Sequence, residues 1–253
     1  MDPGSVRERL MQELRELLKR SRRVLVFTGA GISTGSGIPD FRGPQGVWKR
    51  RQPVYFDEFL RDESKRVEHW DYKLEGWDAF RAAQPNPAHR ALVRLEEDGR
   101  LLALVTQNID GLHHRAGHSP DKVLELHGTN RLVECLGCGR RSQPEWAFEE
   151  FRATRRCPRC PECGGLIKTA TISFGQTMPA ELLERAMQAA RSADLVLALG
   201  SSLSVEPAAS VPLEGWRSGA TYVVVNQGPT AHDRMAHLRL EGDLTRLLPA
   251  ALC

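Results

Sequence analysis

Five short apolar runs constrain the fold of this chain most strongly, because each is followed at once by small or polar residues. Apolar runs of this length are typical of strands that are buried on both faces of a parallel sheet. Ligands bind outside the carboxyl ends of such strands, where the small and polar residues would gather. The sequence therefore predicts an α/β fold with a doubly wound parallel sheet. The expected strands are residues 23–28, 101–106, 122–126, 194–199 and 220–225.

The first of these strands opens into a glycine-rich segment, residues 29–37, with the sequence GAGISTGSG. Glycines let the backbone approach a pyrophosphate and turn N–H groups toward it. The usual dinucleotide fingerprint has glycine at the sixth position, where this chain has Thr34. Taken alone, the segment fits a flexible loop as well as a nucleotide site. A rigid residue, a carboxylate, an aromatic ring and a guanidinium then follow, in Pro39, Asp40, Phe41 and Arg42.

Length and charge narrow the classes of protein to consider. A chain of 253 residues can bury a full core, and we expect one large domain with a small satellite. The 35 basic and 32 acidic residues give a net charge of +3, too small to indicate direct binding of nucleic acid. Apolar runs stay well short of the ~20 residues of a membrane span. We expect a monomeric, cytoplasmic protein without a membrane segment.

Helices are expected between the strands. Residues 5–20 have the apolar spacing of an amphipathic helix, and residues 88–97, 180–192 and a segment from Asp243 onward are further candidates. Residues 44–98 contain no convincing strand, and their tryptophans and phenylalanines suggest a helical, aromatic-rich insertion.

Four cysteines have the spacing of a metal site. Cys135, Cys138, Cys160 and Cys163 form a C-x2-C-x21-C-x2-C array, which is typical of tetrahedral zinc bound by two knuckles. Such a zinc would be structural, because four protein ligands leave no open position. Cys157 and Cys160 form a competing pair, disfavoured because the residue after Cys160 is a proline without an N–H. A zinc ribbon alone would also suit an adaptor or a nucleic-acid-binding module.

Polar residues at the ends of the second and third strands are candidates for chemistry. Gln107, Asn108 and Asp110 offer donors and acceptors for ribose hydroxyls and a carboxamide, although such residues are also common in turns. His127 could take a proton near neutral pH, but most histidines, including most of the seven others here, have structural roles. The occurrence of all these groups at the ends of successive strands favours one site.

Together these motifs closely resemble those of the sirtuins, the NAD-dependent protein deacylases. The GAGIS and GIPDFR segments, Gln-Asn-Ile-Asp at 107–110, Leu-His-Gly at 126–128, the two cysteine knuckles, Ser-Phe-Gly at 173–175 and Gly-Ser-Ser-Leu at 200–203 all match. The resemblance extends over about residues 22–252. It implies a Rossmann-like NAD-binding domain formed by 1–44, 99–133 and 167–253, a helical insertion at 45–98 and a zinc-binding module at 134–166.

The resemblance also implies the activity and the residues that carry it. The expected reaction removes acyl groups from lysine side chains of proteins and releases nicotinamide and O-acyl-ADP-ribose, with ADP-ribosyl transfer to protein as the enzymatic alternative. His127 would act as general base toward a ribose hydroxyl, Asn108 would assist, and one structural zinc would bind the four cysteines of the array. Residues 172–175 (Ile172, Ser173, Phe174, Gly175) would bind the substrate backbone as an added strand. The implied NAD-binding residues are Gly29, Ala30, Gly31, Ser33, Pro39, Asp40, Phe41, Arg42, Gln107, Asn108, Ile109, Asp110, His127, Gly200, Ser201, Ser202, Asn226, Gln227, Gly228, Asp243 and Leu244.

Three features of the sequence bear on the preferred acyl group. Residues 168–172 are KTATI where many relatives have Arg-Pro-Asp-Val-Val, which changes the expected shape of the acyl tunnel. Residues 76–89 and 226–230 look most like the class II branch that includes a mitochondrial sirtuin of broad acyl range. Relatives that take acidic acyl groups carry Tyr-x-x-Arg, whereas this chain has Tyr72 and Glu75 in that spacing. The sequence thus predicts poor activity on succinyl-lysine, unless another arginine such as Arg81 grips the carboxylate.

Overall fold

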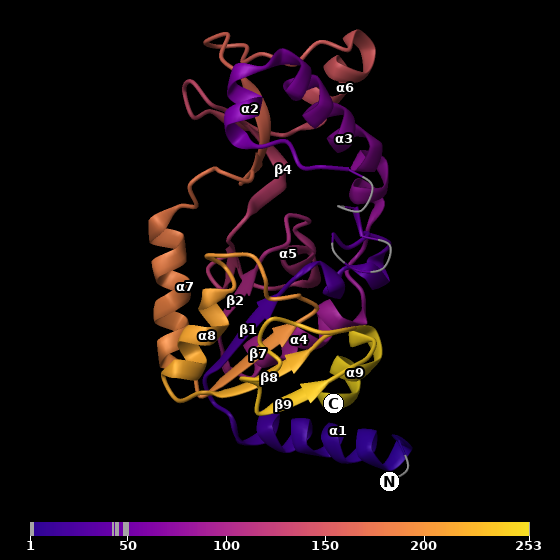
Figure 1. Ribbon diagram of the computed structural model, residues 1–253, viewed down its shortest axis with the longest axis vertical. Helices are drawn as coiled ribbons and strands as arrows, with labels where there is room; N and C mark the ends of the chain where they lie inside the picture. Colours follow the sequence, from indigo (N-terminus) through magenta and orange to yellow (C-terminus); the bar gives the residue numbers. More distant parts are fainter. Residues whose placement is uncertain (1–2, 42, 44–45, 48–50, 253) are drawn as a thin grey trace.

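The computed structural model describes residues 3–41, 43, 46–47 and 51–252, so Arg42 lies outside the described residues. The molecule is elongated, with a large sheet and its helices in the lower part of Figure 1 and a smaller region above it. Both chain ends lie at the lower end, near the helix α1 (Pro3–Arg20). None of the described helices combines the length and the apolar character that a membrane span needs.

The large sheet is parallel and has the strand order β3-β2-β1-β7-β8-β9. All five predicted strands are confirmed within a residue or two at their ends. The sixth, β9, was not predicted because its three residues form no apolar run. The order reverses between β1 and β7, which is where open parallel sheets bind ligands. The strands are β1 (Val24–Thr28), β2 (Leu101–Thr106), β3 (Val123–Glu125), β7 (Leu195–Leu199), β8 (Thr221–Val225) and β9 (Leu238–Leu240).

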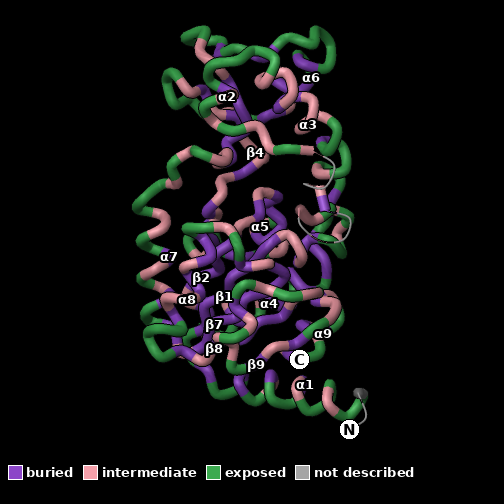
Figure 2. The backbone as a smooth tube through the Cα atoms, in the orientation of Figure 1, coloured by how far each residue is buried: buried purple, intermediate pink, exposed green. Residues whose placement is uncertain are grey.

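Helices cover both faces of this sheet, and alternate strand residues point to opposite faces. Val24 and Val26 belong to the apolar core beneath α1, α4 and α9, whereas Leu25 and Phe27 belong to the core beneath α7 and α8. Burial is therefore concentrated on the strands, as Figure 2 shows in purple. The helices packed around the sheet are α4 (Pro87–Glu97), α5 (Leu112–Ala116), α7 (Ala180–Ser192), α8 (Ser210–Arg217) and α9 (Leu244–Ala251).

The smaller region contains a three-stranded antiparallel sheet and three helices around an aromatic core. Trp70 and Phe148 pack edge to face with ring centroids 5.4 Å apart, and Trp77 stacks on Phe148 at 4.0 Å. The expected aromatic-rich helical segment is thus present, and it packs against the cysteine-bearing segment. The elements are β4 (Gly128–Cys135), β5 (Arg141–Ser142), β6 (Ile167–Thr171), α2 (Phe56–Arg61), α3 (Glu63–Ala82) and α6 (Glu145–Thr154).

The helix α4 lies in the large region rather than with α2 and α3. Its Leu92 and Leu95 are fully buried in the core shared with α1 and α9. Asn86 caps it by accepting a hydrogen bond from the Ala88 N–H at 2.9 Å. This packing groups residues 87–97 with the sheet, whereas the sequence suggested a single insertion from 45 to 98. The other domain limits stay predictions.

Candidate NAD and acyl-lysine site

A cleft of about 1130 Å³ lies where the carboxyl edge of the large sheet meets the smaller region. Its lining comes from both regions: the loops after β1, β2, β7 and β8 on one side, and α3 with the segment after β6 on the other. Most of the residues predicted from the sequence line it: Gly29, Ala30, Gly31, Asp40, Phe41, Gln107, Asn108, Ile109, His127, Ile172, Ser173, Phe174, Gly175, Gly200, Ser201, Ser202, Asn226, Gln227, Gly228, Asp243 and Leu244. Ser33, Pro39 and Asp110 do not.

The glycine-rich segment packs directly on the end of β7. The N–H of Gly29 donates to the Leu199 carbonyl at 3.0 Å, and the N–H of Gly31 donates to the Gly200 carbonyl at 2.8 Å. A Cβ atom on Gly31 would lie 2.8 Å from the Gly200 Cα, and Gly200 itself has φ +63°. These glycines therefore allow the loops after β1 and β7 to pack closely at the point where the strand order reverses. The N–H groups of Gly29 and Gly31 form hydrogen bonds between these loops and do not point toward a phosphate.

Ser33, Asn108 and Asp110 form a hydrogen-bonded set behind the cleft wall. The Asn108 side-chain amide donates to the Gly29 carbonyl and to Ser33 Oγ, both at 3.1 Å. Ser33 Oγ in turn donates to Asp110 Oδ2 at 2.7 Å. Adjacent strands β1 and β2 bring these loops together, since their carboxyl ends lie side by side. The set fixes the Asn108 side chain at the cleft, where Ser33 and Asp110 support it from behind.

Burial raises the pKa of Asp110, and the hydrogen bonds that it accepts from the Leu112 N–H and Ser33 oppose this effect. Loss of either hydrogen bond would leave a buried polar group without a partner, which would cost free energy. Asp110 therefore holds Ser33 and the Leu112 N–H in fixed positions. The geometry gives Asp110 a supporting position rather than direct exposure to a ligand.

His127 lies between the two regions, just before β4, and lines the cleft. Its Nδ1 is 3.1 Å from the Gln107 carbonyl oxygen. Because a carbonyl can only accept, Nδ1 carries the proton, and Nε2 has the lone pair that can take up another. The Gln107 side chain donates to Ser201 Oγ at 2.7 Å, which joins the ends of β2 and β7. His127 thus has the tautomer that a general base requires.

The far end of the cleft is formed by the loops after β8 and β9. The Asn226 amide donates to the carbonyls of Gln227 and Gly228, which holds this turn closed. Asp243 caps α9 by accepting from the Thr245 N–H at 2.8 Å. The side-chain hydrogen bond from Thr245 contributes most to a lowered pKa of Asp243, so a carboxylate sits at this end.

Residues 172–175 follow β6 and run along the cleft. The Ile172 N–H donates to the His127 carbonyl at 2.8 Å, and the Phe174 carbonyl accepts from the Phe56 N–H at 2.9 Å. The rings of Tyr55 and Phe174 lie 5.9 Å apart. The segment is therefore anchored at both ends, to the loop that carries His127 and to the start of α2.

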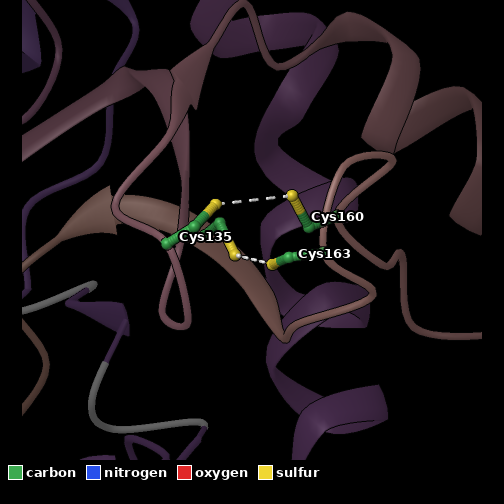
Figure 3. A group of neighbouring side chains, drawn as sticks. Cys135, Cys160 and Cys163 are labelled. Carbon is green, nitrogen blue, oxygen red and sulfur yellow. Dashed lines mark hydrogen bonds between the residues drawn. The ribbon is translucent and has the colours of Figure 1, made fainter.

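The four cysteines of the predicted array converge from two loops, as Figure 3 shows for three of them. All four sulfur atoms lie within 4.8 Å of one another. Tetrahedral zinc with Zn–S bonds of ~2.3 Å places sulfurs about 3.8 Å apart, so this spacing fits one zinc ion. The Gly137 N–H points at the Cys135 sulfur at 3.3 Å, a stabilising contact for a thiolate. Cys157 is buried in the aromatic core and is not part of the group.

The cleft also contains residues that the sequence did not assign to a site. On α3, Glu68, His69 and Lys73 line it, together with Tyr72, which the sequence had already related to the acyl group. Val205 and Glu206 line it after β7. His69, Tyr72 and Lys73 share one helix face at the spacing i, i+3 and i+4. That spacing was visible in the sequence, but nothing in the sequence indicated which face of the helix would meet the cleft.

Comparison with known proteins agrees with this geometry. The "NAD-dependent protein deacetylase" of Rhodopseudomonas palustris is 42% identical over 238 residues, which cover 94% of this chain and 94% of that protein. A Sir2 structure solved with a peptide and NAD+ is 40% identical, has a TM-score of 0.85 and covers 94% of this chain and 95% of its own. A Sir2 structure bound to acetylated peptide gives 38% identity, a TM-score of 0.83 and the same coverages. The Sir2 family's sequence profile matches residues 29–207, and this chain therefore belongs to the Sir2, or sirtuin, family.

Proposed function

We propose that this protein removes acyl groups from lysine side chains of proteins with consumption of NAD. The observation that carries this proposal is the meeting of Asn108 and His127 in one cleft at the point where the strand order reverses. Family membership and the names of its relatives support the same activity. The products expected are free lysine, nicotinamide and O-acyl-ADP-ribose.

Different residues of the cleft would bind, orient and deprotonate the reactants. NAD would supply the ribose carbon that accepts the acyl oxygen, with nicotinamide as the leaving group. Nε2 of His127 takes a proton from a ribose hydroxyl, and the Gln107 carbonyl keeps the imidazole in the required tautomer. Asn108, fixed by Ser33, orients the ribose and the nicotinamide amide. Phe41 lines the cleft after the glycine-rich segment and would exclude water from the reacting carbon.

The remaining residues hold the two ends of the reactants. Ser201, Ser202 and Asn226 suit the phosphates and the adenosine, while the substrate backbone adds as a strand beside residues 172–175. The four clustered cysteines would hold a zinc ion, which would link the two cysteine-bearing segments and have a structural role. Zinc would then affect activity through the position of β4 and β6, whose ends carry His127 and the substrate segment.

A product assay tests the proposal. The protein is incubated with NAD and an acetyl-lysine peptide, and the products are resolved by mass spectrometry. Equal amounts of nicotinamide, deacylated peptide and O-acyl-ADP-ribose are expected. ADP-ribose attached to the peptide or to the protein would favour ADP-ribosyl transfer instead. Absence of nicotinamide with every acyl peptide, together with tight binding of nucleic acid, would favour the zinc-ribbon adaptor.

A further inference from the structure

Lys73 lies in the wall of the cleft without an acidic partner. Its ammonium donates to Asn130 Oδ1 at 2.9 Å, and in the described part of the chain it forms no ion pair. The side chain is only partly exposed, and it lines the cleft together with His69. A cation that leaves water without a counter-ion loses hydration that one neutral hydrogen bond does not replace. This cation is therefore suited to an anion that arrives from the cleft.

A second lysine strengthens the positive potential at this wall. Lys168 on β6 is 1% exposed, and its ammonium donates to the carbonyls of Thr169 and Thr171. Burial, and then the charge of Lys168, lower the pKa of Lys73 to about 7. Burial likewise lowers the pKa of Lys168 to about 8. An incoming carboxylate would reverse these effects, because it offsets both the burial cost and the repulsion between the two cations.

His69 provides an independent sign of a missing ligand group. It is 6% exposed, lines the cleft and lies one helical turn before Lys73 on the same face of α3. Its Nε2 atom is buried and has no hydrogen-bond partner among the residues that the structure describes. Burial and the charges of Lys73 and Lys168 push its pKa well below the usual value, so the ring is neutral. A neutral imidazole can donate one N–H to an oxygen that enters beside Lys73.

The two residues that the sequence placed at this subsite lie elsewhere. Glu75 is exposed and pairs with Arg51, so its carboxylate is not part of the cleft wall. Arg81 is also exposed and stacks over the Trp77 ring at 5.8 Å. The like-charge repulsion expected from Glu75 therefore does not arise at the cleft wall. Arg51 and Glu68 also line the cleft, but Arg51 pairs with Glu75, and Glu68 pairs with Lys65. Among the described lining residues, Lys73 is thus the cation without an acidic partner.

The position of Lys73 along the cleft suggests what the anion is. Lys73 donates to Asn130, which comes three residues after His127 in the chain. The Cα atoms of Asn130 and His127 are therefore at most about 10 Å apart. Resting on the proposed deacylation at His127, we propose that Lys73 and His69 bind a carboxylate at the distal end of a short acyl chain on the substrate lysine. The chemical class of substrate is thus a dicarboxylic acyl-lysine, for which succinyl-lysine is the probe.

A pair of peptides isolates the carboxylate. One peptide carries succinyl-lysine and the other butyryl-lysine, so both acyl chains have four carbons and differ in the terminal charge. For the wild-type protein we expect a kcat/KM for succinyl at least equal to that for butyryl. Lys73→Met should lower the succinyl-to-butyryl ratio by about 10- to 150-fold, the range for one charged hydrogen bond. Lys73→Arg should retain most of the ratio, and His69→Phe should lower it less than Lys73→Met does.

Lys19→Met is the matched control, because Lys19 lies on α1, pairs with Glu16 and, like Glu16, does not line the cleft. It should leave the ratio unchanged. An equal loss for both peptides in Lys73→Met would overturn the inference, since it would indicate a purely structural role. A rise of the KM for NAD with both peptides would also overturn it, in favour of a contact with the NAD phosphates. A wild-type ratio far below one would do the same while leaving deacylation intact, whereas no turnover of either peptide would overturn the proposed function as well.

Discussion

The two regions that enclose the cleft are stabilised in different ways. The large sheet is covered on both faces, and its two cores consist almost entirely of leucine, valine, isoleucine and alanine. The described core of the smaller region has ten buried residues, of which four are aromatic and three are cysteines. A small core of this kind buries too little apolar area to hold long loops by itself. We infer that the large region is self-sufficient and that the smaller one depends on zinc.

This difference matters for function because the site needs both regions. Asn108 and the glycine-rich segment belong to the large sheet, whereas the segment 172–175 follows a strand of the smaller one. His127 is placed at the junction, between β3 and β4. Damage to the smaller region should therefore abolish catalysis while much of the NAD-binding surface stays folded.

Loss of a zinc ligand should have the largest effect, and it should act on the smaller region. Cys163→Ala should reduce the zinc content from one ion per chain to near zero and cause aggregation, because structural zinc contributes most of the folding free energy of such modules. Cys157→Ala is the control, since its sulfur lies outside the cluster, and it should keep its zinc. Zinc content by atomic absorption decides the matter. Loss of zinc from Cys157→Ala with retention in Cys163→Ala would show that the ligand set is wrong.

Replacement of the histidine at the junction should leave both regions folded and remove the chemistry. We expect His127→Ala to lower kcat by about 10²–10⁴-fold, as for other general bases, with the Kd for NAD changed only a few-fold. Single-turnover kinetics and a binding titration separate these effects. His114→Ala, a change outside the cleft lining, serves as control. Near-normal turnover of His127→Ala at saturating NAD would rule out its role as base.

A substitution that creates a cavity in the centre of the large sheet shows how much this sheet contributes to the free energy of unfolding. Leu197 on β7 is 1% exposed, and Leu197→Ala should cost about 2–5 kcal/mol of unfolding free energy. The matched change Leu60→Ala, at a site 43% exposed, should cost under about 0.5 kcal/mol. Urea denaturation followed by circular dichroism gives both values. If the two variants lost the same stability, the sheet would not be the main source of stability.

The smallest expected effect concerns the cap of α9. Asp243→Ala removes the acceptor for the Thr245 N–H and should destabilise the protein by about 1 kcal/mol. Because Asp243 also lines the cleft, the KM for NAD should rise, while kcat should change little. Thr245→Val, which removes only the hydroxyl that bonds to Asp243, should show a smaller rise of the KM. Equal changes of KM in both variants would assign the effect to the cap rather than to NAD contact.

The sequence predicted the large sheet well because its strands are continuous apolar runs. Residues 101–106 and 180–192 have the bounds that were expected from their patterns. The small sheet could not be predicted in the same way. β4 mixes polar and apolar residues without a regular alternation. β6 buries Lys168, whose ammonium donates to two backbone carbonyls and to the Gln176 side chain.

The site was predictable as a set of residues but not as an arrangement. Asn108, Asp110 and Ser33 were identified separately, and only the order β2-β1-β7 shows that Ser33 joins the other two. The place of Lys73 depends on how α3 is rotated against β4, which a helical pattern does not fix. The same uncertainty explains why Glu75 was assigned to the cleft from spacing alone. In the structure Glu75 does not line the cleft, and it pairs with Arg51, which does.

Hydrogen–deuterium exchange after zinc removal shows directly whether the smaller region depends on zinc and the large region does not. The holoprotein is compared with protein treated with a chelator, and exchange is mapped by mass spectrometry. We expect protection to be lost in residues 134–166 and in α3 and α6, while β1, β2, β7 and β8 keep theirs. Loss of protection throughout the large sheet, or unchanged protection around the cysteines, would contradict this expectation.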